Sequence, residues 1–336
     1  MIPLKPTLLR LLAWIKSPWR KDDTKPPSNF LQLPVELVRS IGERLPLRNQ
    51  LVLGLTCRDL RVVFYHRRDS PKNLSHKQFL EYLAVLARDM PDKWVCELCM
   101  DFHPIITSDT PSLPEMSSCP LESMHVDYNL LLFRLKHRHV QLTLKYTRVA
   151  QLDRRYRNYL KALLSTTQST FSTHQFERTS LITRLDTYPK VVKGNYLLLS
   201  ILQYTKNLRA VSPYTMGSLR ICQHQDLAFP SGQRLRLFFR YGPWRSQMGL
   251  SRIVDSAFDS PGIEIQGYCP GCPTDFTVQA TSEQATIRIW QNLGTESPPL
   301  RSDWVVHTYE YLNFRRRPVE YLTYKKPGTV RSLYEK

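Results

Sequence analysis

The chain of 336 residues lacks any run of about 18 uninterrupted apolar residues, the length that a helix needs to cross a bilayer. It also lacks a phosphate-binding loop, a dinucleotide fingerprint, a zincin helix and a nucleophile elbow. No pair of a histidine and a carboxylate residue has a sequence spacing that is typical of acid–base catalysis. We therefore expect neither a membrane span nor an enzyme.

Acidic residues are also scarce relative to basic ones. The chain has 29 Asp+Glu and 47 Lys+Arg, which gives a net charge of +18. An excess of this size favours acidic partners such as nucleic acid. The basic residues are dispersed along the chain, however, and this is more typical of a solvated basic surface. A zinc-containing basic protein that binds nucleic acid stays the alternative reading, with residues 154–161 and 311–318, which mix Arg with aromatic residues, as its candidate contacts.

Glycine is rare as well, with 12 residues against 24 prolines, and this balance predicts stiff, irregular connections. The hydrophobic fraction of 42% is ordinary for a globular protein, and the length indicates about two folded units. Residues 1–30 predict a disordered or flexible tail. The stretch "PTLLRLLAWIKSPWR" within it has no small-residue cleavage site, so we expect a protein of the cytoplasm, the nucleus or both.

The rest of the chain predicts an α+β fold. Residues 67–126 contain one helical pattern, 76–89, followed by a Cys/His-containing linker without periodicity. Residues 127–336 are β-rich, since segments such as "QRLRLFFRY" and "ATIRIWQN" concentrate β-branched and aromatic residues. Within this region "FRLKHRHVQLTLKY" favours a helix, and we expect His137 and His139 on its surface.

A Leu-rich block at residues 31–66 predicts three short helices with tight turns. Pro34 and Pro46 suit helix starts, because a missing N–H costs nothing there. Apolar residues then recur at helical spacing from Leu37 to Leu45. Thr56 and Asp59 form a capping-box pattern before the third helix. Such a block is too small to bury a core of its own, so its apolar excess must pack against a partner or against the rest of the chain.

The residues "LPVEL" at 33–37 and "LTCR" at 55–58, with apolar positions between them in matching order, resemble an F-box. Many F-boxes have tryptophan where this chain has Leu60. A looser likeness to uncharacterised fungal F-box proteins with a Cys/His-containing C-terminal region extends through "CPGCPTDF" and beyond. The resemblance implies an F-box from 31 to 66, followed by a region that recruits a protein substrate.

F-box proteins are substrate-receptor subunits of cullin–RING (SCF-type) ubiquitin ligases. The resemblance implies that this chain binds a Skp-type adaptor, and through it a cullin, and presents an unknown substrate without being a catalyst itself. The implied adaptor-binding residues are Leu33, Pro34, Leu37, Ile41, Leu45, Leu51 and Leu55.

Seven cysteines form an odd number, which does not suit a closed disulfide framework. Four of them make two C-x-x-C pairs, a spacing that presents two thiolates to one metal ion. We expect one or two structural zinc ions, held by two sets that consist of Cys96, Cys99, His103 and Cys119, and of Cys222, His224, Cys269 and Cys272. A rival arrangement joins the two C-x-x-C pairs in one site. The wide spread of these residues along the chain argues against a RING-type ligase.

Overall fold

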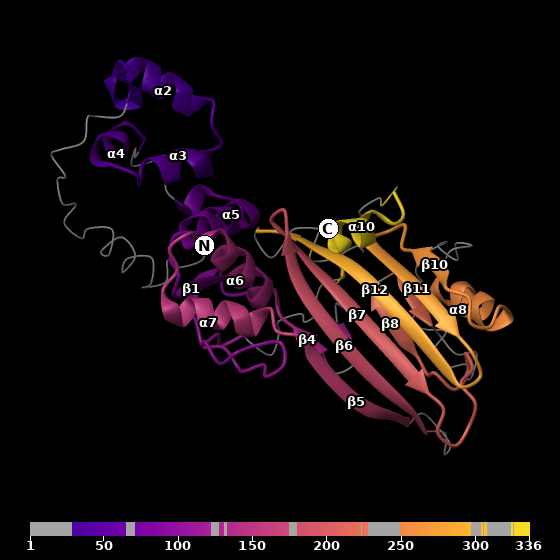
Figure 1. Ribbon diagram of the computed structural model, residues 1–336. Helices are drawn as coiled ribbons and strands as arrows, with labels where there is room; N and C mark the ends of the chain where they lie inside the picture. Colours follow the sequence, from indigo (N-terminus) through magenta and orange to yellow (C-terminus); the bar gives the residue numbers. More distant parts are fainter. Residues whose placement is uncertain are drawn as a thin grey trace. The chain divides into compact units, whose positions relative to one another are not determined.

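The structure is a computed structural model, and it describes residues 29–64, 71–121, 128–130, 133–174, 180–222, 224–227, 249–296, 304, 306–307, 324 and 326–336 (Figure 1). The chain divides into two compact units, residues 1–104 and 105–336. No helix among the described residues is long and apolar enough to cross a membrane. The expected α+β class is confirmed, with helices first and a sheet-rich C-terminal region after them.

The first unit is mainly helical and ends in a β-hairpin. Its elements are η1 (Asn29–Gln32), α2 (Val35–Glu43), α3 (Leu47–Leu53), α4 (Arg58–Phe64), η2 (Pro71–Asn73), α5 (His76–Ala87), β1 (Lys93–Cys96) and β2 (Asp101–Pro104). Pro34 and Pro46 directly precede α2 and α3, as their sequence positions predicted. The helix expected at 76–89 is α5, which begins with a capping box between Ser75 and Gln78.

The three helices α2, α3 and α4 enclose a very small core. Its fully buried members are Val38, Leu60 and Phe64. The Phe64 ring lies directly on the backbone of α2, because a Cβ added to Gly42 would meet its Cε1 atom at 1.9 Å. Glycine at this position therefore allows α2 and α4 to approach closely.

The capping box expected at Thr56 is wrong. The Thr56 hydroxyl donates to the carbonyl of Leu53 at 2.7 Å, so it continues the turn after α3 and does not cap α4. Cys57 takes the capping position instead, because its Sγ accepts the backbone N–H of Leu60 at 3.5 Å. A thiol is a weaker acceptor than a hydroxyl, so this cap contributes little to the stability of α4.

The second unit is built on a six-stranded antiparallel sheet with the strand order β10-β11-β12-β7-β6-β5. Its helices are α6 (His137–Arg148), α7 (Arg154–Leu163), α8 (Leu250–Asp259) and α10 (Thr329–Glu335). Its strands are β3 (Tyr128–Leu130), β4 (Phe133–Leu135), β5 (Thr167–His174), β6 (Ser180–Val192), β7 (Asn195–Thr205), β8 (Leu219–Cys222), β9 (Gln225–Leu227), β10 (Ile265–Tyr268), β11 (Thr274–Ala280) and β12 (Gln284–Thr295). The pairs β3–β4 and β8–β9 are separate hairpins.

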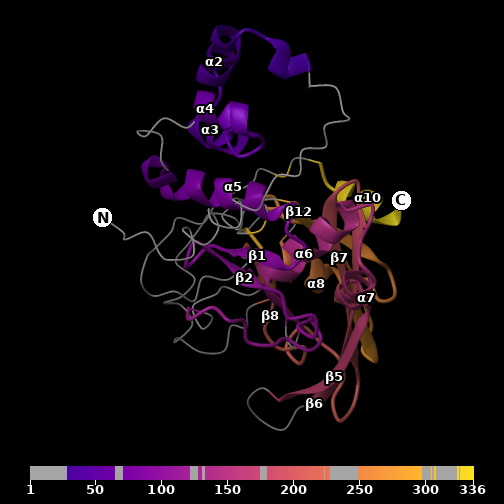
Figure 2. The same cartoon turned by 90° about the vertical axis from the view of Figure 1, so that its left-hand side faces the viewer.

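One face of the sheet carries the core of this unit. A row of opposed residues across four neighbouring strands consists of Leu185, Leu202, Ile287 and Val278, all at most 1% exposed. Apolar residues of α6, α8 and β8 pack on this face, and α10 lies against the other face (Figure 2). The carboxylate of Asp275 on β11 fixes α10 there, since it accepts the backbone N–H groups of Gly328, Val330 and Arg331 at 2.9–3.0 Å.

Two sequence expectations need correction. The linker expected to be loop-like contains β2 at 101–104, because residues 101–104 pair with β1 at 93–96 as an antiparallel hairpin. The helix expected from "FRLKHRHVQLTLKY" is present as α6, but His137 and His139 are buried rather than at the surface. The expected strand "QRLRLFFRY" lies outside the described residues.

Candidate metal centres

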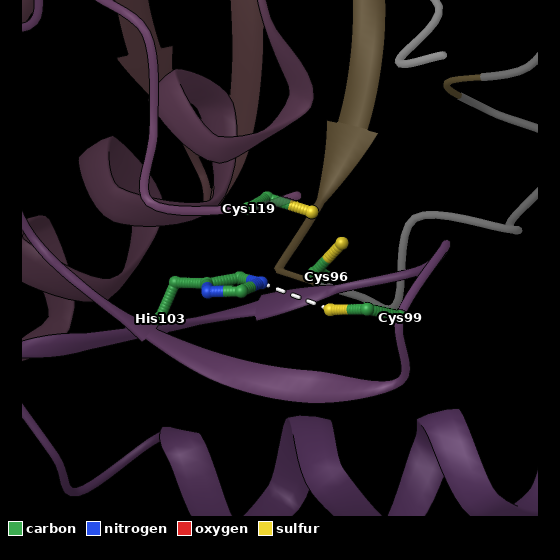
Figure 3. A group of neighbouring side chains, drawn as sticks. All are labelled: Cys96, Cys99, His103 and Cys119. Atoms are coloured by element: carbon green, nitrogen blue, oxygen red, sulfur yellow. Dashed lines mark hydrogen bonds between the residues drawn. The ribbon is translucent and has the colours of Figure 1, made fainter. Parts of the chain in front are cut away.

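The first Cys/His cluster is centred on the β1–β2 hairpin. Cys96 ends β1, Cys99 lies in the turn and His103 lies on β2, while Cys119 follows 16 residues later in the chain. All four side chains point toward a common centre, as Figure 3 shows, and their ligand atoms lie within 4.8 Å of one another. The Cys99 Sγ and His103 Nε2 atoms are 2.9 Å apart. The three sulfur atoms of the cysteines and one ring nitrogen of His103 thus face one point.

The backbone of the hairpin turn is adapted to this convergence. Met100, directly after Cys99, has a φ of 51°, a left-handed conformation that a residue with a side chain rarely adopts. Such a residue tightens the turn so that the thiols at positions 96 and 99 point to the same side. The Cys119 Sγ also accepts the backbone N–H of Leu121 at 3.4 Å.

The second Cys/His cluster lies wholly within the second unit. Cys222 ends β8, His224 lies in the turn between β8 and β9, and Cys269 and Cys272 flank the Pro-Gly turn between β10 and β11. Their ligand atoms also lie within 4.8 Å of one another, and the Sγ atoms of Cys222 and Cys269 are 3.7 Å apart. Two sulfurs of a tetrahedral zinc site with Zn–S bonds of about 2.3 Å lie about 3.8 Å apart. The separation therefore fits a shared tetrahedral ion.

Small residues make room for this second cluster. The backbone N–H of Gly271 donates to Cys269 Sγ at 3.4 Å, and the Thr274 hydroxyl lies 3.2 Å from Cys272 Sγ. A Cβ at Gly271 would lie only 2.8 Å from Cδ2 of His224. The imidazole of His224 thus packs directly on the glycine backbone, and this is the physical reason for glycine in the turn.

The three thiols of the second cluster differ in the direction in which their pKa values are shifted. Hydrogen bonds from the thiols of Cys222 and Cys272 lower the pKa of Cys269. Burial raises the pKa of Cys222 and of Cys272. Burial thus disfavours the thiolate form of two of the three cysteines, and a divalent cation at the centre would favour the thiolate form of all three.

Both four-residue sets that the spacing predicted are therefore brought together, and the rival arrangement that joins the two C-x-x-C pairs is wrong. None of the seven cysteines forms a disulfide, and Cys57 belongs to neither set. No family model, no curated protein and no solved structure matches this chain.

The residues implied as adaptor-binding are divided by the structure into exposed and buried groups. Leu33, Leu37 and Ile41 are 37%, 52% and 42% exposed, and Pro34 is exposed too. Leu45 and Leu55 are half-buried. Leu51 is only 2% exposed, so it packs inside the first unit and is not available at its surface. Its position on the inner side of α3 could not be read from helical spacing in so short a segment.

The basic segment 154–161 forms most of α7, whose arginines are exposed. Its tyrosines are engaged within the fold: Tyr156 stacks on Tyr146 with ring centroids 5.4 Å apart, and the Tyr159 hydroxyl donates to the Asp109 carbonyl at 2.7 Å. Base stacking needs a free aromatic face. The interleaved pattern on α7 therefore reflects packing of the tyrosines. The second such segment, 311–318, lies outside the described residues.

Proposed function

We propose that this chain is an F-box substrate receptor of a cullin–RING (SCF-type) ubiquitin ligase. In this proposal the helices α2, α3 and α4 bind a Skp-type adaptor, which connects the chain to a cullin. The sheet-rich second unit recruits a protein substrate. The chain itself needs no catalytic residue, because a receptor acts by holding the lysines of its substrate near a charged conjugating enzyme.

The observation that carries the proposal is an exposed apolar stripe on and just before α2. Leu33, Leu37 and Ile41 follow one another at intervals of four residues, so they lie on one side of the helix. Val38 and Gly42, each one position further on, face the small core of the three helices. The stripe therefore points away from that core. Leu33, Leu37 and Ile41 are also positions at which the F-box resemblance implies contact with the adaptor.

We further propose that each Cys/His cluster holds one structural zinc ion. Three thiolates and one imidazole are the soft and borderline ligands that zinc prefers, whereas calcium and magnesium prefer oxygen ligands. Each set supplies four protein ligands, which fills a tetrahedral shell and leaves no position for a substrate. Zinc at these sites would stabilise the fold and would not take part in catalysis.

The adaptor interaction is tested by co-expressing the full-length chain with a Skp-type adaptor and measuring the affinity of the purified partners by calorimetry. We expect a 1:1 complex. The double variant Leu37→Asp/Ile41→Asp should bind on the order of 1,000-fold more weakly, because two buried apolar anchors at about 2 kcal/mol each are lost. The matched control is Val85→Asp on α5, which is also an exposed apolar residue, at 39%, but lies outside the three helices.

The control should bind as the wild type does, and circular dichroism should show all three proteins folded. If the wild type does not bind the adaptor, or if the double variant binds as tightly as the control, the receptor proposal is wrong. In that case salt-dependent binding to nucleic acid becomes the next property to measure.

A further inference from the structure

One polar side chain in the core of the second unit, that of Gln291, is buried between apolar neighbours. Gln291 on β12 is 0% exposed, and it lies on the apolar face of the sheet, between Ile289 and Leu293 along the strand. A buried amide costs free energy unless its groups are hydrogen-bonded. Here the Nε2 group donates to the carbonyl of Ile221 at 2.8 Å and lies 3.2 Å from Nδ1 of His307. The two N–H bonds of one amide thus have two separate acceptors.

The carbonyl that Gln291 binds belongs to the residue directly before the metal-ligand candidate Cys222. The β8–β9 ladder is irregular at this point: Arg220 pairs with Asp226, and Cys222 pairs with Gln225. This shift leaves Ile221 as an extra residue, which is a β-bulge. A bulge bends the strand and changes the direction of the following side chain. The direction of the Cys222 thiol therefore depends on how this bulge is held.

His307 fixes the orientation of the Gln291 amide. Its Nε2 lies 3.0 Å from the carbonyl of Asn292, and a carbonyl can only accept, so Nε2 carries the proton. Nδ1 is then the acceptor and requires the amide nitrogen, not the amide oxygen, of Gln291 to face it. This tautomer is assigned from the hydrogen-bond network. The same amide nitrogen is the one that reaches Ile221.

We propose that Gln291, oriented by His307, is a positioning residue for the second metal centre: it holds the bulge at Ile221 and thereby directs Cys222 Sγ toward the ion. The inference rests on the proposed zinc site. It assigns to Gln291 and His307, which are not ligands themselves, the role of residues that orient the ligands of a metal site. Substitution of such residues typically weakens metal binding by about 10- to 100-fold.

The test compares zinc binding by the full-length wild type with the variant Gln291→Met, which keeps length and volume but removes both donors. Affinities are measured by competition with a chromophoric chelator, and the same proteins are loaded with Co²⁺ to record its visible ligand-field bands. We expect the second site to lose about 10- to 100-fold in zinc affinity. The Co²⁺ bands of that site should shift, because the sulfur of Cys222 changes its direction, and the first site should be unchanged.

The matched control is Ser200→Ala on β7, which removes another buried polar group from the same face of the sheet. It should bind zinc as the wild type does. A second variant, His307→Phe, leaves the donor to Ile221 in place and should cause a smaller loss than Gln291→Met. This variant tests the same chain of contacts if Gln291→Met folds poorly.

The outcomes separate the two proposals. If the wild type binds no zinc at the second site, the zinc proposal itself is wrong. If the wild type binds zinc and Gln291→Met binds it equally well with unchanged Co²⁺ bands, the positioning role alone is overturned. Equal losses in Gln291→Met and Ser200→Ala would also overturn it, since they would reflect general damage to the core.

Discussion

The purified full-length chain should contain two zinc ions and should show one rapidly reactive thiol in its native state. Six of the seven cysteines belong to the two Cys/His clusters, three in each, and only Cys57 lies outside them. A thiolate that binds zinc reacts far more slowly with a disulfide reagent than a free thiolate does. Zinc is measured by mass spectrometry of the metal, and thiols are counted with a chromogenic disulfide before and after chelation in denaturant, which should expose all seven.

Substitution of one ligand should remove one ion. Cys269→Ser should lower the zinc content from two to one and expose the remaining thiols of its cluster. The second unit should also lose stability: at a free zinc concentration 1,000-fold above the dissociation constant, a bound ion contributes about 4 kcal/mol to the free energy of unfolding. Thermal unfolding with and without zinc measures this difference.

The matched control is Cys57→Ser, which changes a cysteine that belongs to neither cluster. It should keep two zinc ions and lose the single fast thiol. Two results would contradict the zinc proposal: a native wild-type chain in which all seven thiols react at once, or a wild type purified without chelators that contains no zinc.

The ligand sets could be predicted from the sequence because the chemistry of a zinc site is local. A C-x-x-C pair already contains half of a tetrahedral shell, and one further Cys and one His complete each set. What the sequence does not contain is the reason why Cys222 meets Cys269, 47 positions later. That meeting depends on the placement of the β8–β9 hairpin beside the turn between β10 and β11, which is a property of the whole sheet.

The same limit explains the wrong expectation for His139. On α6 it stands in a run of basic and polar residues, and such a run is usually solvated. Its burial is possible only because Asp109, 30 residues earlier, supplies a compensating carboxylate. Gln291 was missed for a similar reason, since its partners at Ile221 and His307 are distant in sequence. Short-range spacing therefore identifies ligands better than it identifies the groups that position them.

The largest loss of stability from a single substitution outside the clusters should come from Asp109. Its side chain is 5% exposed and accepts hydrogen bonds from Arg138 Nε at 2.6 Å, from His139 Nε2 at 3.0 Å and from the backbone N–H of Glu115 at 2.8 Å. Arg138 is equally buried and also donates to the carbonyl of Glu115 at 2.6 Å. The network fixes an irregular loop on the first turn of α6.

Asp109→Asn should therefore lower the free energy of unfolding by about 3–5 kcal/mol, because it leaves the buried guanidinium of Arg138 without a counter-charge. The matched control is Asp186→Asn. Asp186 is also a buried carboxylate paired with an arginine, but the side chain of Arg184 is 45% exposed, so water can solvate it when the pair is broken. The control should cost about 1 kcal/mol or less. Urea unfolding compares the two, and equal costs would contradict the role assigned to the network.

The network should also make stability depend on pH. Burial lowers the pKa of His139. The carboxylate of Asp109 does not outweigh this effect, since the guanidinium of Arg138 already balances its charge. Burial alone would raise the pKa of Asp109, but the hydrogen bonds from His139 and Arg138 outweigh it and lower that pKa. In both cases the unfolded chain takes up the proton first on acidification. The contribution of the network to the free energy of unfolding is therefore fully present above about pH 6.5, the ordinary pKa of histidine. It decreases as the pH falls below this value.

The contribution of His139 can be isolated with the variant His139→Gln, whose amide N–H still donates to Asp109 but does not titrate. Between pH 6 and pH 5 the free energy of unfolding of the wild type should fall more steeply than that of the variant, by up to about 1.4 kcal/mol per pH unit, which corresponds to one proton. His307, whose pKa burial lowers to about 4, contributes equally to both proteins and cancels. Equal slopes would mean that His139 is protonated in the folded chain, and that the carboxylate of Asp109 then balances two cations rather than one.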